Sequence, residues 1–294
     1  MRLRMRAGGA LIGLAAAAAL VAGCGGSGSS GSGKTPTVSL SRAADVSSAA
    51  SGYRIAMNMQ ETVPSAGRIH MTGTGSFSPA AHQGAATMQM DLPAGAGAGT
   101  LQLGMVLDKT TIYMKLPASL TSKIPGGKPW LYVNLGQIGQ AAGVPGLGSL
   151  VSSTSSLNDP GQYLDYLHAT SAGSVKNLGQ ATVDGVHTTE YHAVVDMTKL
   201  PNIVPAAQRP AIEQLVKALK SKGLATQMPI NAWIDSSNLV RRVQVAFSEP
   251  LPNTKQTVSI AMTENFLQYG PQPAPAIPSA SESANLLSLI HGSS

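Results

Sequence analysis

The sequence has a single cysteine, Cys24, so no disulfide can form within the chain. Large aromatic and charged residues are also scarce, with 3 Phe, 2 Trp and 12% charged residues among 294. The fold therefore needs a core of Val, Leu, Ile, Ala and Met, and the chain is long enough to bury one. Three of the charges in the net +6 are arginines within the first six residues, which leaves about +3 beyond them. So small an excess does not favour nucleic acid as a partner.

Catalytic motifs are absent as well. No Gly-x-Ser-x-Gly elbow of a serine hydrolase occurs beyond residue 23. His187 and His192 flank Glu190, but a spacing of five in a strand points the two rings to opposite faces. The zinc motif HExxH needs a spacing of four on a helix. We therefore expect neither an enzyme nor a metal or cofactor site.

One sequence match is misleading. Residues 28–35 fit the phosphate-binding P-loop pattern, but no strand precedes them and Pro36 follows them. A P-loop needs a strand and a helix to hold its amides around phosphate. A linker rich in Gly and Ser produces this pattern by chance, so we do not expect nucleotide binding.

The N-terminus has the features of an export signal. Three arginines precede an apolar run over residues 10–22, which is too short to span a bilayer stably. Cys24 follows Val-Ala-Gly directly, and this arrangement resembles a bacterial lipobox, in which the thiol is acylated with diacylglycerol and the chain is cut before it. A plain secretory signal with an incidental cysteine is the alternative. The lipobox predicts a lipoprotein anchored at Cys24 to the extracytoplasmic face of the cell membrane.

Composition divides the rest of the chain. We expect a signal peptide at 1–23, a Gly/Ser-rich tether at 24–37, a single domain at 38–270 and a Pro-rich tail at 271–294. A flexible tether of this length spans about 20 Å, so the domain can sit away from the membrane surface.

Alternation of apolar and polar residues predicts strands over much of the domain. The first half reads as an antiparallel meander from Tyr53 to Leu135, after a short helix at 39–51. The second half predicts short strands at 175–178, 181–183 and 188–197, a helix at 206–222, a hairpin at 232–248 and a last strand at 257–269. Residues 136–156 read as a loosely helical flap, and Asp159-Pro160 reads as a helix start. The pattern predicts an α+β fold, with one antiparallel sheet and helices on its concave side.

Two stretches resemble a known family. Residues 159–196 begin with Asp-Pro and contain Gly-Gln-Ala-Thr-Val-Asp-Gly-Val-His-Thr-Thr-Glu-Tyr, and the hairpin at 234–243 contains Leu-Val-Arg-Arg. With the lipobox and the tether, these resemble the LolA/LolB-like bacterial lipoproteins, most similarly the actinobacterial LppX/LprG type. The resemblance implies a strongly curved sheet, an open half-barrel, wrapped over a few helices. It also implies an apolar cavity for acyl chains, and binding or transfer of lipids or lipidated glycans within the envelope.

Methionines give independent support for a lipid site. Seven fall at apolar-face positions of the predicted meander: Met57, Met59, Met71, Met88, Met90, Met105 and Met114. Methionine is flexible and polarisable, and is common where a surface accepts apolar partners of different shapes. These residues are candidates for the cavity lining, although methionines that fill an irregular core would give the same pattern.

Two functions of different class remain open. The first is a membrane-anchored lipoprotein that binds and carries an acyl lipid or glycolipid in an apolar cavity, without chemistry. The second is a tethered sensor or interaction module of the same fold that binds another envelope protein through its helix-covered face. Whether the cavity is hollow or filled by its own side chains decides between them.

Overall fold

The computed structural model divides the chain into two units, Met1–Thr35 and Pro36–Ser294, and only the second is described here. It describes residues 36–291 except 64–66, 94–98, 123, 135–136, 138–166, 171–172, 205, 207–208, 222–224 and 251–256. The predicted signal, Cys24, the P-loop-like stretch and the start of the predicted helix at Asp159 lie outside the described residues. So does the predicted flap at 136–156, apart from Gln137.

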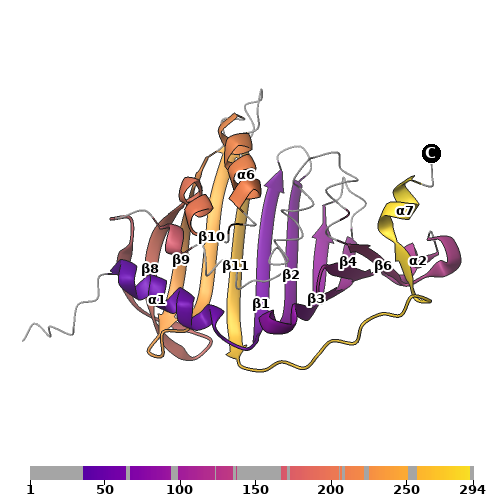
Figure 1. Cartoon of the computed structure of the whole chain (residues 1–294), viewed down its shortest axis with the longest axis horizontal. Helices are drawn as coiled ribbons and strands as arrows, with labels where there is room; N and C mark the ends of the chain where they lie inside the picture. The colour runs from indigo at the N-terminus through magenta and orange to yellow at the C-terminus, as the bar shows by residue number, and fades with distance from the viewer. Residues whose placement is uncertain are drawn as a thin grey trace, which may run out of the picture. The chain divides into compact units, whose positions relative to one another are not determined.

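Twelve strands form one sheet in the described part of the chain (Figure 1). They are β1 Tyr53–Val63, β2 Gly67–Ser78, β3 Gln83–Leu92, β4 Gly99–Asp108, β5 Thr111–Lys115, β6 Trp130–Asn134, β7 Lys176–Val183, β8 Val186–Asp196, β9 Gln227–Asp235, β10 Val240–Pro250, β11 Thr257–Tyr269 and β12 Ser283–Asn285. Their order is β12-β6-β5-β4-β3-β2-β1-β11-β10-β9-β8-β7. The β12–β6 pair is parallel, and the other pairs are antiparallel.

The sheet consists of two meanders joined in the middle. Strands β1 to β6 follow one another along the chain, and so do β7 to β11. The joint is the pairing of β1 with β11, in which Met57 lies opposite Glu264 and Tyr53 lies opposite Tyr269. The result is a large, mostly antiparallel, curved sheet that does not close, which confirms the predicted α+β half-barrel class.

Helices lie on one face of the sheet, over its second half. The longer ones are α1 Pro36–Ser48 and α6 Arg209–Ser221, with the short turns η5 Leu167–Ala169 and η6 Met197–Asn202 beside them. Figure 1 shows α1 and α6 on the same side of the sheet, across the region of β8 to β11. Smaller helical segments are η1 Pro79–Ala81, α2 Ala118–Thr121, η3 Pro125–Gly127 and α7 Leu286–His291.

The core lies between these helices and the sheet. Leu40 of α1, Leu167 of η5 and Leu200 of η6 are fully buried against Ile230, Val243 and their neighbours on the strands. Aliphatic residues supply most of it, as the shortage of Phe and Trp predicts.

Four aromatic rings form a cluster at the joint between the two meanders. Tyr53 contacts Phe77 and Phe266 at centroid distances of 6.1 and 5.6 Å, and Phe266 stacks on Tyr269 at 5.6 Å. Gly84 lies opposite Phe77, and a Cβ there would stand 2.3 Å from the Phe77 ring. The glycine therefore makes room for the ring.

Several predicted element boundaries differ from the structure. The first helix begins at Pro36 rather than at 39, since proline suits the first helical turn. The two short strands predicted at 175–178 and 181–183 are one strand, β7, with a bulge between Asn177 and Gly179. The φ of Gly179 is +109°, which suits glycine. The tail after residue 271 contains a short strand, β12, which pairs with β6, and the helix α7 follows this strand.

Candidate functional site

The seven predicted methionines share the face of the sheet that carries the core. Along β1, Met57 and Met59 continue the alternation of Tyr53 and Ile55, both of which are buried. Cross-strand pairing then carries the same face through β2, β3, β4 and β5. The sequence pattern therefore assigned these side chains to the correct face.

The pairing places methionines directly opposite one another. Met59 lies opposite Met71, which lies opposite Met90, and Met105 lies opposite Met114. Directly opposed side chains have Cβ atoms about 4.5–5.5 Å apart, within contact distance for methionine. We call the surface formed by the seven predicted methionines, together with Met262 described next, the methionine face.

One member of this surface, Met262 of β11, was not among the residues predicted from the sequence. It lies opposite Met59 on one side and Val245 on the other, so four methionines run across four adjacent strands. Met262 alternates with Ile260 and Glu264 in its strand, but nothing local in the sequence shows that the last long strand pairs with the first.

A glycine, Gly73, separates Met57 from Met88 in the cross-strand register. Gly73 lies opposite both residues, and a Cβ at Gly73 would stand 3.0 Å from Cγ of Met88. Met88 therefore lies against the space that a side chain at Gly73 would occupy, and methionine can change rotamer more easily than branched residues.

Most of the methionine face is half-buried. Met57, Met59, Met71, Met88, Met90 and Met105 have intermediate exposure. Met105 packs against the core, whereas Met114 near the far end is 38% exposed. The surface thus runs from the helix-covered core toward the half of the sheet that contains β4 and β5.

A buried carboxyl group marks the boundary between core and methionine face. Glu264 of β11 is 2% exposed and lies between Val243 of β10 and Met57 of β1. Burial of a carboxylate among apolar side chains is costly, so such a group needs a structural or functional reason.

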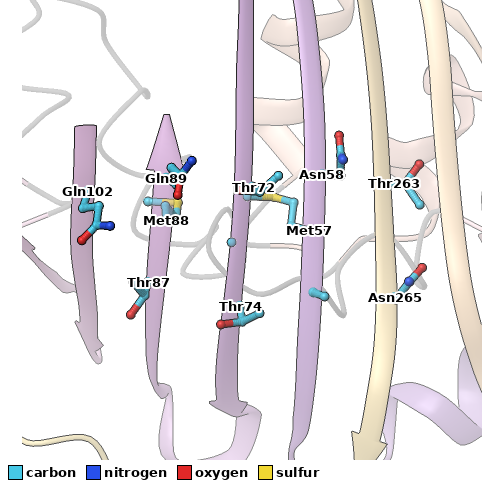
Figure 2. Close-up of a pocket in the computed structure, with 12 residues that line it drawn as sticks. Met57, Asn58, Thr72, Thr74, Thr87, Met88, Gln89, Gln102, Thr263 and Asn265 are labelled. Atoms are coloured by element: carbon cyan, nitrogen blue, oxygen red, sulfur yellow. The ribbon is translucent and has the colours of Figure 1, made fainter. Parts of the chain in front are cut away.

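The opposite face of the sheet carries a groove of about 480 Å³. Ala56, Asn58, Thr72, Thr74, Thr87, Gln89, Gln102, Thr263 and Asn265 line it together with Met57, Gly73 and Met88. Figure 2 shows the labelled polar side chains on successive strands. Of the seven predicted lining residues, only Met57 and Met88 border this groove, so it is distinct from the methionine face.

Two of the polar groups considered for chemistry, His192 and Glu190, have structural partners. Nδ1 of His192 lies 2.8 Å from Oδ1 of Asn231, whose amide donates to Glu190 at 3.1 Å. Within the described residues, no group of three or more His, Cys, Asp or Glu side chains could hold a metal ion.

Both arginines of the β9–β10 hairpin are also engaged. Nε of Arg241 donates to Asp235 at 2.7 Å, and its guanidinium lies over the Tyr269 ring. Nε of Arg242 donates to Asn265 at 2.7 Å, and its guanidinium lies over Trp233. These contacts fix both side chains on the protein surface.

No helix within the described residues is long and apolar enough to cross a membrane.

No family model and no curated protein matches the chain. Among solved structures, similar ones include LprF from Mycobacterium bovis, 15% identical with a TM-score of 0.40, covering 82% of this chain and 96% of that one. The Mycobacterium tuberculosis lipoprotein LppX is 14% identical with a TM-score of 0.43, covering 82% and 98%. A LolA superfamily protein from Nitrosomonas europaea is 7% identical with a TM-score of 0.28, covering 82% and 96%.

At these identities the likeness concerns the fold.

Proposed function

We propose that this chain is a membrane-anchored lipoprotein that binds and carries an acyl lipid or lipidated glycan within the cell envelope. The observation that carries the proposal is the methionine face: eight methionines in cross-strand register, largely half-buried, that extend the core face of the sheet from β11 through β5. A core that only needed filling would use well-packed branched residues, which have better-defined rotamers.

The physical basis is burial of acyl methylenes against these side chains. Each methylene removed from water contributes about 0.8 kcal/mol, so one acyl chain supplies enough free energy for stable binding. Methionine rotamers adapt to chains of different length and saturation, which suits a carrier for related lipids.

Native mass spectrometry of the full chain, extracted in detergent from a lipid-containing bacterial host, tests the proposal. A stoichiometric non-covalent acyl lipid is the expected result. Met57→Trp and Met105→Trp should lower the occupancy because an indole fills the space of the chain. The matched control is Asn58→Trp, which places the same ring next to Met57 but on the opposite face. A lipid-free mass without uptake of a fluorescent fatty acid would contradict a carrier.

The anchor is a separate part of the proposal. It depends on Cys24, which follows the apolar run and precedes the Gly/Ser tether. The intact mass of the exported chain should correspond to cleavage before Cys24 plus a diacylglycerol group. Cys24→Ser should abolish the added mass and release the protein from the membrane fraction, while lipid binding by the folded domain persists.

The second candidate is a tethered interaction module that binds another envelope protein. Its support is on α1, where Val38 and Val46 are 50% and 37% exposed, on the helix-covered side of the sheet. Val38→Ser with Val46→Ser should then abolish capture of that partner by cross-linking in the envelope. If the protein is a lipid carrier, the same two substitutions should leave lipid occupancy unchanged.

A further inference from the structure

The face opposite the helices carries an uncharged polar surface that the lipid-binding proposal does not use. One row of directly opposed residues crosses six strands from β10 to β4: Gln244, Thr263, Asn58, Thr72, Gln89 and Gln102. A second row beside it, from β11 to β4, consists of Asn265, Ala56, Thr74, Thr87 and Gly104. Except for Gln244 and Gly104 at their ends, the residues of both rows line the groove of about 480 Å³.

The second row ends in a cation and an indole on each side. Beyond Asn265 lie Arg242 and Trp233, and beyond Gly104 lie Lys115 and Trp130. The guanidinium lies 5.6 Å from the Trp233 ring centre, and the ammonium lies 5.8 Å from that of Trp130. These cations are held outside the groove, and none of the described residues that line it is ionisable.

The groove offers amides and hydroxyls that are available for a ligand. Asn58, Thr74 and Gln102 are exposed, and none of their side chains makes a hydrogen bond within the described residues. An amide presents both a donor and an acceptor, and a hydroxyl does the same. Such a surface matches a ligand whose own groups both donate and accept without carrying charge.

We propose that this groove binds an extended strand of a neutral polysaccharide. Sugar hydroxyls are uncharged and both donate and accept, so they complement the rows of Asn, Gln and Thr. Neighbouring strands lie about 4.8 Å apart, so each row repeats at a spacing comparable with that of pyranose units in an extended glycan. Among the described residues, the lining holds no cation for a phosphate or carboxylate, which favours a neutral polymer over an acidic one.

The position of the groove disfavours an extended peptide. Peptides that join a sheet add at an edge, where backbone groups are unpaired. The groove lies on the face of β11, β1, β2, β3 and β4, which are paired on both sides. Only side chains can therefore hold the ligand.

Isothermal titration of the full chain in detergent with maltohexaose, cellohexaose and chitohexaose tests the proposal, with the acidic hexamer of galacturonate as the charged probe. At least one neutral hexamer should bind, and the acidic hexamer should not. Thr74→Trp should abolish binding by filling the groove. Asn58→Ala with Gln102→Ala should weaken it about tenfold through loss of two hydrogen-bonding groups.

Two control variants separate this site from its surroundings. Ser259→Ala changes an exposed residue of β11 on the same face but outside the groove lining, and should leave binding unchanged. Met105→Trp, at a residue outside the groove lining, should lower lipid occupancy and leave glycan affinity intact, so failure of the lipid proposal would not affect this one. Binding of none of the neutral hexamers, equal binding of the acidic hexamer, or full binding by correctly folded Thr74→Trp would overturn the proposal.

Discussion

Ser47 and Val240 are joined by a buried hydrogen bond although they are 193 residues apart, since the Val240 amide donates to the Ser47 hydroxyl at 2.9 Å. The carbonyl of Val240 accepts from the Tyr269 hydroxyl at 2.6 Å. Burial raises the pKa of Tyr269 above its ordinary value, so this hydroxyl stays protonated and keeps donating. One residue at the start of β10 thereby ties α1 and β11 together.

Ser47→Ala should lower the free energy of unfolding by about 1–3 kcal/mol, because it leaves the buried Val240 amide without its acceptor. Urea denaturation followed by circular dichroism measures the change. Ser41→Ala in the same helix is the matched control, since Ser41 is only half-buried. Equal stability of the two variants would contradict a role for the Ser47 contact.

Asp196 is the second site for which we predict a stability effect, and its effect depends on pH. Thr198 donates to its carboxylate from the hydroxyl at 2.6 Å and from the amide at 3.0 Å. These bonds lower the pKa of Asp196 below its ordinary value. A lowered carboxyl pKa stabilises the fold above the unfolded-state pKa, and this contribution is lost as the pH falls through the folded-state pKa.

Asp196→Asn should therefore be less stable than the unchanged protein at pH 7, and the difference should shrink as the solution is acidified through the range where Asp196 protonates. Urea midpoints measured along a pH series test the sign. A difference that grows with acidification would show that the carboxylate does not carry the effect.

Lys128 holds the C-terminal tail against the sheet. Its ammonium donates to the carbonyls of Ala280 and Ser283 at 3.1 and 2.8 Å, next to the parallel pairing of β12 with β6. Figure 1 shows the tail crossing from β11 to this distant edge. Lys128→Met should therefore speed amide hydrogen exchange in residues 283–285 while leaving β1 and β11 protected. Lys109→Met, at an exposed turn, is the control.

Local pattern predicted the strands well and their order poorly. The alternation over Tyr53–Gln60 and the boundaries of the last long strand at 257–269 agree with β1 and β11. Their pairing was not predicted, because two strands some 200 residues apart carry no local signal of each other. The three residues of β12 are too few for a period-two pattern to show.

The residues on the two faces of the sheet could also be predicted only in part. Apolar alternation assigned seven methionines to the core face, but Met262 joined them only through the β1–β11 pairing. The groove was missed because Asn58, Thr74 and Gln102 read as ordinary solvent-exposed positions. Their alignment into rows depends on cross-strand register, which the sequence does not specify directly.

Met262 offers a sharp test of the methionine face. It lies opposite Met59, so an indole at either position enters the same space from adjacent strands. Met262→Trp should lower lipid occupancy as strongly as Met59→Trp, measured by native mass spectrometry of the full chain. Ala261→Trp places the ring one residue away on the opposite, exposed face and should leave occupancy unchanged. If Ala261→Trp lowered occupancy while Met262→Trp did not, the lipid would lie on the other face of the sheet.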